Sequence, residues 1–73
     1  MTIYIKANSK KAINEALSNN ETITGTNHSI FGGGGDYSLT ECPTGTTIKV
    51  YDKLVGGSPY AKAYGTWNGT KVI

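Results

Sequence analysis

The stretches Thr47-Ile-Lys-Val-Tyr-Asp-Lys-Leu54 and Pro59-Tyr-Ala-Lys-Ala-Tyr-Gly-Thr-Trp67 each alternate between two kinds of side chain. Such alternation with period two is typical of β-strands that have two different faces. The residues between them, Val55-Gly-Gly-Ser58, are taken to close a hairpin. We therefore expect a long hairpin with an apolar face of small and aliphatic residues and a second face of lysines and tyrosines.

The hairpin register predicts three lysine–tyrosine pairs across the two strands: Lys53 with Tyr60, Tyr51 with Lys62, and Lys49 with Tyr64. The opening stretch Thr2-Ile-Tyr-Ile-Lys6 repeats the alternation, so its tyrosine and lysine should join the same face of the sheet. We call this surface the tyrosine–lysine face, and its eight predicted members are Tyr4, Lys6, Lys49, Tyr51, Lys53, Tyr60, Lys62 and Tyr64. It is the main candidate for a partner-binding site.

One helix is predicted, from a cap at Asn8 or Ser9 to about Asn19, with an apolar stripe at helical spacing that covers the apolar side of the sheet. Short strands are expected at residues 21–26 and 37–40, and the Asn68-Gly69 pair predicts a two-residue hairpin that returns residues 70–73 onto residues 64–67. The predicted fold is α+β: a single helix on one face of a mostly antiparallel sheet of four to five strands, a two-layer sandwich.

Residues 1–73 are expected to form a single domain, because a chain of this length cannot divide its apolar surface between two cores. The net charge is only +2, all the basic residues are lysines, and residues 19–46 contain none of them. The absence of arginine argues against bidentate reading of guanine bases. With no apolar run of membrane-spanning length and one cysteine, we expect a cytoplasmic protein without contact to a membrane.

The residues that could carry catalysis are few. His28 and Ser29 are neighbours in the chain, and neighbours on an extended segment point in different directions, so no catalytic triad can be inferred. Cys42 has no evident base, and one histidine with one cysteine is a poor supply of zinc ligands. We therefore expect a protein without enzymatic activity, catalytic residues, metal or cofactor.

Two further segments are secondary candidates for binding. Gly32 to Gly35 is a glycine run that lacks the lysine and the following helix of a phosphate-binding loop, and it predicts a flexible loop beside Phe31, which either docks on a partner or fills the core. Lys10 and Lys11 lie in the first turn of the predicted helix, where they either form an anion site or lie in solvent.

The tyrosine–lysine face allows three interpretations. It is an ordinary solvated surface; or it stacks the bases of a single-stranded nucleic acid on tyrosines while lysines follow the phosphates; or it anchors a protein partner. Four tyrosines exceed what solvation of a sheet requires, and the low net charge favours a protein or ribonucleoprotein partner over nucleic acid alone. A homodimer is also compatible with the sequence.

Taken with the helix at residues 9–17, the Pro43-Thr-Gly45 turn and the segment Val55 to Trp67, the chain resembles the small anti-defence proteins of bacteriophages and mobile elements, anti-CRISPR proteins above all. The resemblance is one of type, in size, lone domain, Gly/Thr/Asn-rich composition and lack of catalytic residues. It implies stoichiometric inhibition in the host cytosol, by occupying a surface of a host defence complex. It transfers no binding residues, and the positive net charge does not fit the members that mimic DNA.

Overall fold

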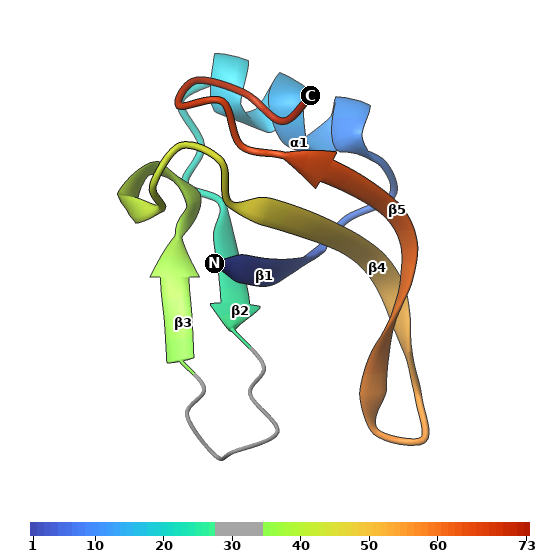
Figure 1. Cartoon of the computed structure of the whole chain (residues 1–73). Coiled ribbons are helices and arrows are strands. Elements are labelled where there is room, and N and C mark those ends of the chain that lie inside the picture. Colours follow the sequence, from blue (N-terminus) through green and yellow to red (C-terminus); the bar gives the residue numbers. More distant parts are fainter. Residues whose placement is uncertain (28–34) are drawn as a thin grey trace.

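The computed structural model describes residues 1–27 and 35–73. It has one helix and one five-stranded sheet, with the strand order β3-β2-β1-β4-β5, which confirms the predicted α+β fold (Figure 1). The elements in chain order are β1 (Thr2–Lys6), α1 (Lys10–Ser18), β2 (Thr24–Asn27), β3 (Gly35–Ser38), the 3-10 turn η1 (Leu39–Glu41), β4 (Thr47–Val55) and β5 (Ser58–Thr66).

The sheet is mixed. The pairs β1–β2, β2–β3 and β4–β5 are antiparallel, as expected for a mostly antiparallel sheet. The central pair β1–β4 is parallel, with Thr2 opposite Thr47 and Lys6 opposite Tyr51. A parallel pair needs a long crossover, and here the chain forms α1, β2, β3 and η1 before it returns to the sheet centre as β4.

Helix α1 begins as the sequence predicts. The Ser9 hydroxyl accepts a hydrogen bond from the Ala12 amide at 3.1 Å, which satisfies one of the free donors of the first turn. After the cap at Asn19, the chain leaves the helix through Asn20, which has a φ of 60°. Ile13 is the buried residue of the helix, and it fixes the side of α1 that packs on the sheet.

The core lies on the inner face of the sheet. Alternate residues of β1 and β4 supply its floor, and α1 supplies Ile13. The turn η1 with the residue that follows it, and the chain after β5, supply the rest. Figure 1 shows α1, η1 and the C-terminal segment gathered at one end of the curved sheet, while the β4–β5 hairpin extends away from them. The buried apolar residues are Ile3, Ile5, Ile13, Leu39, Cys42, Ile48, Val50, Trp67 and Val72.

The β4–β5 turn follows the prediction. Val55 pairs with Ser58, and the two glycines between them have positive φ angles of 60° and 83°, the conformation that a two-residue turn requires. Strand β2 begins at Thr24, later than the predicted residue 21, and β3 begins at Gly35, earlier than the predicted residue 37. The residues after Ser38 form η1 and not a continued strand.

The C-terminal residues fold back antiparallel onto the end of the β5 segment as predicted, but the expected two-residue turn at Asn68-Gly69 is wrong. Trp67 pairs with Val72, so four residues make the connection, and the last residues form an isolated bridge in place of a strand. The reason is local: the Asn68 side-chain oxygen accepts hydrogen bonds from the amides of Thr70 at 2.9 Å and Lys71 at 2.8 Å. An asparagine side chain that bonds the backbone ahead of it builds its own turn.

The C-terminal segment is tied to the helix by one side chain. The Asn14 amide nitrogen donates to the Val72 carbonyl at 2.8 Å, and its oxygen accepts from the Val72 amide at 2.8 Å. Beneath this contact lies Gly65, where a Cβ atom would come within 2.6 Å of a Val72 methyl group. The Asn14 side chain therefore pairs with the Val72 backbone as a neighbouring strand would. Gly65, which has no side chain, lets Val72 lie close to β5.

Replacing Asn14 by alanine should lower the free energy of unfolding by about 1–3 kcal/mol, because it leaves both backbone groups of buried Val72 without partners. Urea unfolding followed by circular dichroism measures the change. Ser18→Ala on the same helix is the control, since its hydroxyl bonds only the exposed Asn14 carbonyl. Equal midpoints for the two variants would show that the Asn14 contact adds no stability.

Candidate functional site

The outer face of the sheet has a central row of residues that crosses all five strands. Strand register places Thr26 opposite Asp36, Tyr4 opposite Thr26, and Lys49 between Tyr4 and Tyr64. The Thr26 hydroxyl donates to the Asp36 carboxylate at 3.2 Å. Three members of the tyrosine–lysine face thus lie side by side at the middle of the sheet.

Lys49 organises this centre. Its Nζ lies 5.3 Å from the ring centre of Tyr4 and 5.9 Å from that of Tyr64, within cation–π range of both rings, and 3.4 Å from the Tyr4 hydroxyl. Tyr51 meets Tyr4 edge to face, with ring centres 6.5 Å apart and planes at 68°. We call these four residues the aromatic cluster. Its side chains hold one another in place, and 61% of the Tyr64 surface remains exposed to solvent.

One predicted pair across the hairpin agrees with the structure, and the others do not form as expected. Lys49 is opposite Tyr64, but Tyr51 pairs with Ala61 in place of Lys62, because the register shifts by one residue there and returns at Leu54. Between these shifts, no pairing of Lys53 with Tyr60 is present. Two compensating irregularities in a long hairpin increase its local twist.

Lys62 is bound within the chain. Its Nζ donates to the Asp52 carboxylate at 2.9 Å. This hydrogen bond lowers the pKa of Asp52; desolvation opposes the shift, and the attraction of the two charges adds to it. Both groups are substantially exposed, so salt screens the pair and its contribution to stability is small. The ion pair instead matters for the charge of the tyrosine–lysine face, because the Asp52 carboxylate neutralises one of its lysines.

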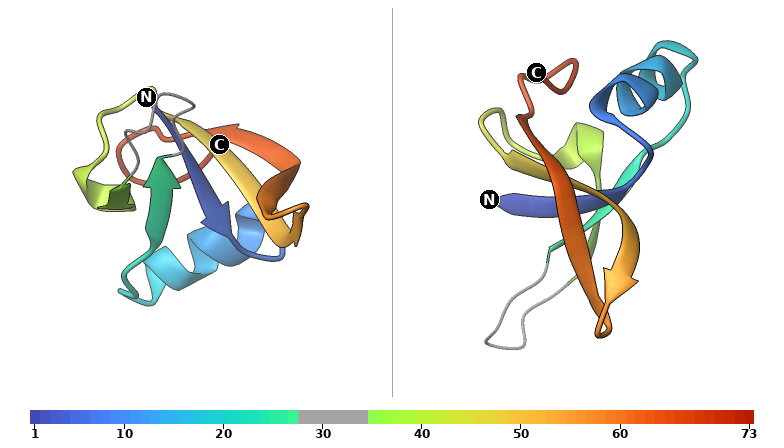
Figure 2. Two further views of the ribbon diagram at one scale, coloured as in Figure 1. Left: turned by 90° about the horizontal axis from the view of Figure 1, so that it is seen from below. Right: turned by 90° about the vertical axis from the view of Figure 1, so that its right-hand side faces the viewer.

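Beyond Tyr51 the hairpin has no β1 beside it, because the parallel pairing ends at Lys6. Figures 1 and 2 show this part of β4 and β5 projecting from the rest of the sheet. It carries Lys53 and Tyr60 of the tyrosine–lysine face, together with Leu54 and Val55, whose surfaces are 60% and 54% exposed. Neither of these apolar residues is among the binding candidates predicted from the sequence. Their position beside a two-residue turn, at the distal end of the hairpin, is the signal that could have identified them as exposed.

The structure gives the secondary candidates separate surroundings. The side chain of Lys10 lies next to Gly65, with its Cδ 2.9 Å from the place of a Cβ there, while Lys11 lies 3.9 Å from Glu15, one turn along the helix. The Ser9 hydroxyl already serves the first-turn amide of Ala12. Phe31, His28, Ser29 and the first three glycines of the run lie outside the described residues, and Gly35 begins β3.

Cys42 is a core residue with 6% of its surface exposed, and its thiol donates to the Ser38 carbonyl at 3.6 Å. Burial raises the pKa of the thiol, and the nearby Glu41 carboxylate raises it further. Because a raised pKa reduces the thiolate fraction at neutral pH, the structure gives this cysteine the character of a packed apolar side chain.

In the folded protein at pH 8, we expect Cys42 to react with a disulfide reagent such as 5,5′-dithiobis(2-nitrobenzoate) at least ~10-fold more slowly than after unfolding in urea, because burial limits both access and ionisation. Absorbance at the thionitrobenzoate band follows the reaction. Free cysteine in the same urea concentration controls for the effect of solvent on the reagent. A folded-state rate equal to the unfolded one would contradict the buried position.

Comparisons with known proteins gave no match: no family model, no curated protein and no solved structure matches the chain. In the part of the chain that the structure describes, no helix has the length and hydropathy of a membrane span. Residues 1–27 and 35–73 also contain no group of three or more histidine, cysteine or acidic side chains that could hold a metal ion.

Proposed function

We propose that this protein is a non-enzymatic inhibitor that acts in the bacterial cytosol and binds a protein surface of a host defence complex, as the anti-defence proteins of bacteriophages do. The observation that carries the binding role is the aromatic cluster of Tyr4, Lys49, Tyr51 and Tyr64 on the outer face of the sheet. The defence target rests on the resemblance in size, composition and lone domain described above.

The aromatic cluster has the properties of an interface anchor. Large aromatic side chains near the centre of an interface supply most of the binding energy. Here the rings are held by their neighbours before any partner arrives, so little side-chain entropy is lost on binding. The exposed ring of Tyr64 offers contact area at the centre, and the exposed lysines around it would steer the protein toward an acidic surface.

The charges of the face favour a protein over a single-stranded nucleic acid. Lys49 lies between two rings, Lys62 is bound to Asp52, and the Asp36 carboxylate occupies the end of the central row. A phosphate backbone gains affinity by releasing counterions to free cations, and it would meet two carboxylates and two engaged lysines along this surface. Nucleic acid remains the second candidate, because three tyrosine rings lie close enough together to stack bases.

Replacing Tyr51 and Tyr64 together by threonine should leave the fold intact, since neither side chain belongs to the buried core and threonine favours strands. The double variant should lose at least ~10-fold in affinity for the partner, because both anchors of the cluster are removed. The measurement is the efficiency of plaquing by a targeted phage on hosts that carry a CRISPR–Cas system and express the protein, followed by titration of the captured complex.

Tyr37→Thr is the matched control for this variant. Tyr37 is an exposed tyrosine of the same sheet on β3, and it is outside the aromatic cluster. The control should protect the phage as the wild type does. Full protection by the Tyr51/Tyr64 double variant would exclude the cluster as the binding site, and failure of the wild-type protein to protect against any tested defence system would count against the inhibitor function.

Direct binding of nucleic acid is tested separately by fluorescence anisotropy with labelled oligothymidine. We expect no saturable binding at 150 mM salt, on the charge argument above. The second candidate predicts the opposite: binding that weakens steeply with salt and that loses roughly 1–3 kcal/mol for each stacking tyrosine removed. That result would replace the protein-partner proposal.

A further inference from the structure

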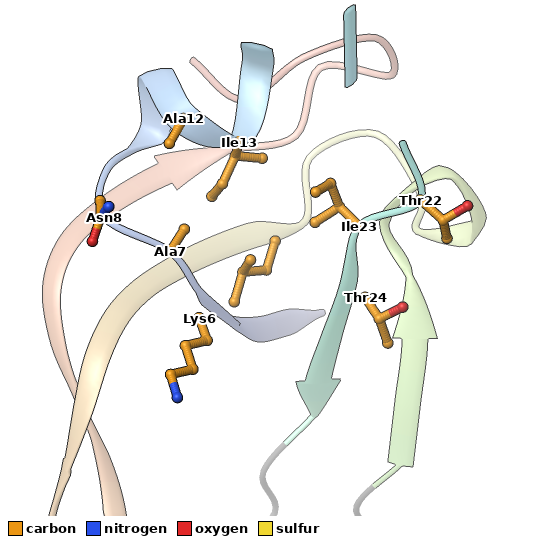
Figure 3. A pocket seen from close by; sticks show the side chains of 9 residues that line it. Lys6, Ala7, Asn8, Ala12, Ile13, Thr22, Ile23 and Thr24 are labelled. Atoms are coloured by element: carbon orange, nitrogen blue, oxygen red, sulfur yellow. The ribbon is translucent and has the colours of Figure 1, made fainter. Parts of the chain in front are cut away.

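Two features of the described chain play no part in the proposed binding face. The first is a pocket of about 440 Å³ between β1, α1 and β2, where Ala12 and Ile13 reach in from the helix while the Lys6 side chain extends away (Figure 3). Its lining residues include no acidic or aromatic side chain, so nothing in the pocket selects an occupant. The second is the turn at Asn68-Gly69, where three hydrogen bonds hold the Asn68 side chain.

These three hydrogen bonds converge on the side-chain oxygen of Asn68. The amides of Thr70 and Lys71 donate to Oδ1 at 2.9 Å and 2.8 Å, and the Thr70 hydroxyl lies 3.0 Å from it. Because backbone amides only donate, two of these contacts identify the atom as the oxygen of the side-chain amide. Donors at these distances stabilise a negative charge that develops on the oxygen, as the donors of an oxyanion hole do.

The nitrogen atoms on either side of this carbonyl group are unengaged. In the part of the chain that the structure describes, neither Nδ2 of Asn68 nor the Gly69 amide forms a hydrogen bond. Both residues are exposed, so water reaches them. Gly69 has a φ of 100° and no side chain that could shield its amide. The Gly69 nitrogen is therefore available as a nucleophile, and Nδ2 is available as a leaving group.

We propose that Asn68 is a modification site at which the folded turn promotes spontaneous deamidation. Hydroxide removes the Gly69 amide proton, and the nitrogen attacks Cγ of Asn68, which places the negative charge on Oδ1. The bond from Cγ to Nδ2 then breaks, and Nδ2 takes a proton from water and leaves as ammonia. Water opens the resulting succinimide ring at either of its carbonyl groups and gives aspartate or isoaspartate. The reacting groups are neighbours in the chain, so no other molecule has to be bound.

Asn14 provides a contrast within the same protein. Both ends of its side chain are bonded to Val72, and the amide that follows it belongs to Glu15, inside α1. An amide that bonds to the preceding turn of a helix cannot attack the side chain before it unless the helix opens. Asn14 should therefore keep its side-chain amide in the folded protein while Asn68 loses its own.

The isoaspartyl product would disturb the C-terminal segment. It moves a methylene group into the main chain, and so lengthens the connection between Trp67 and Val72 by one carbon. The hydrogen bond of 3.0 Å from the Asn68 amide to the Lys71 carbonyl depends on that length. Asn68→Asp keeps both the length and the acceptor. The isoaspartyl form, separated by chromatography, should therefore unfold at a lower urea concentration than this variant.

The test incubates the whole protein at pH 8, in buffer and in urea that unfolds it, and peptide mass spectrometry locates the gain of about 1 Da. We expect Asn68 to deamidate at least ~3-fold faster in the folded protein than in urea, because the three donors converge only in the turn. A peptide of residues 66–70, with and without urea, controls for the solvent. A folded-state rate equal to or below the rate in urea would overturn the proposal, since the turn would then give no acceleration.

Thr70→Val tests the donors directly, because it removes the hydroxyl and keeps the backbone amide and the shape of the side chain. The folded variant should deamidate at least ~2-fold more slowly than the folded wild type, and the two unfolded chains should react at the same rate. Thr44→Val is the matched control: its hydroxyl lies near Gly69 but does not bond to Asn68, so the wild-type rate should persist. Equal folded-state rates for Thr70→Val and the wild type would overturn the proposed role of the donors. The test uses the protein alone and does not depend on the function proposed for the tyrosine–lysine face.

Discussion

The parallel pairing of β1 with β4 is the constraint on which the rest of the structure depends. It places Ile3 beside Ile48 and Ile5 beside Val50 on the inner face, which makes the floor of the core. The same register places Tyr4 beside Lys49 and Lys6 beside Tyr51 on the outer face. Because side chains alternate along a strand, a slip of one residue in this pair would exchange core and surface. Core and aromatic cluster are therefore two consequences of one register.

The edges of the sheet carry features that limit pairing with other strands. At β5, the Thr66 amide and carbonyl are already bonded to Ile73, Pro59 has no amide hydrogen to donate, and the register shift at Tyr51 adds twist. The opposite edge, β3, has only four residues. Short, irregular or covered edges reduce unwanted strand addition, and the binding role proposed for this protein therefore rests on the outer face of the sheet and not on its edges.

The four lysines of the tyrosine–lysine face differ in how they are engaged within the chain. Lys49 lies between two tyrosine rings, and Lys62 is bound to Asp52. Lys6 is opposite Tyr51 in the parallel register, and Lys53 lies on the projecting part of the hairpin; both are exposed. Under the proposed function, these two lysines would steer the protein toward an acidic partner surface.

The sequence by itself determined the local elements: the alternation of β1, β4 and β5, the Ser9 cap of α1 and the Gly56-Gly57 turn all follow from residues a few positions apart. The same alternation kept the eight residues of the tyrosine–lysine face out of the buried core. Tertiary structure alone decided that Tyr4 meets Lys49, that Asn14 binds Val72 and that Tyr51 shifts to Ala61. The physical reason is range: periodicity and turn chemistry are properties of adjacent residues, whereas strand neighbours and register depend on how distant segments bury their apolar faces together.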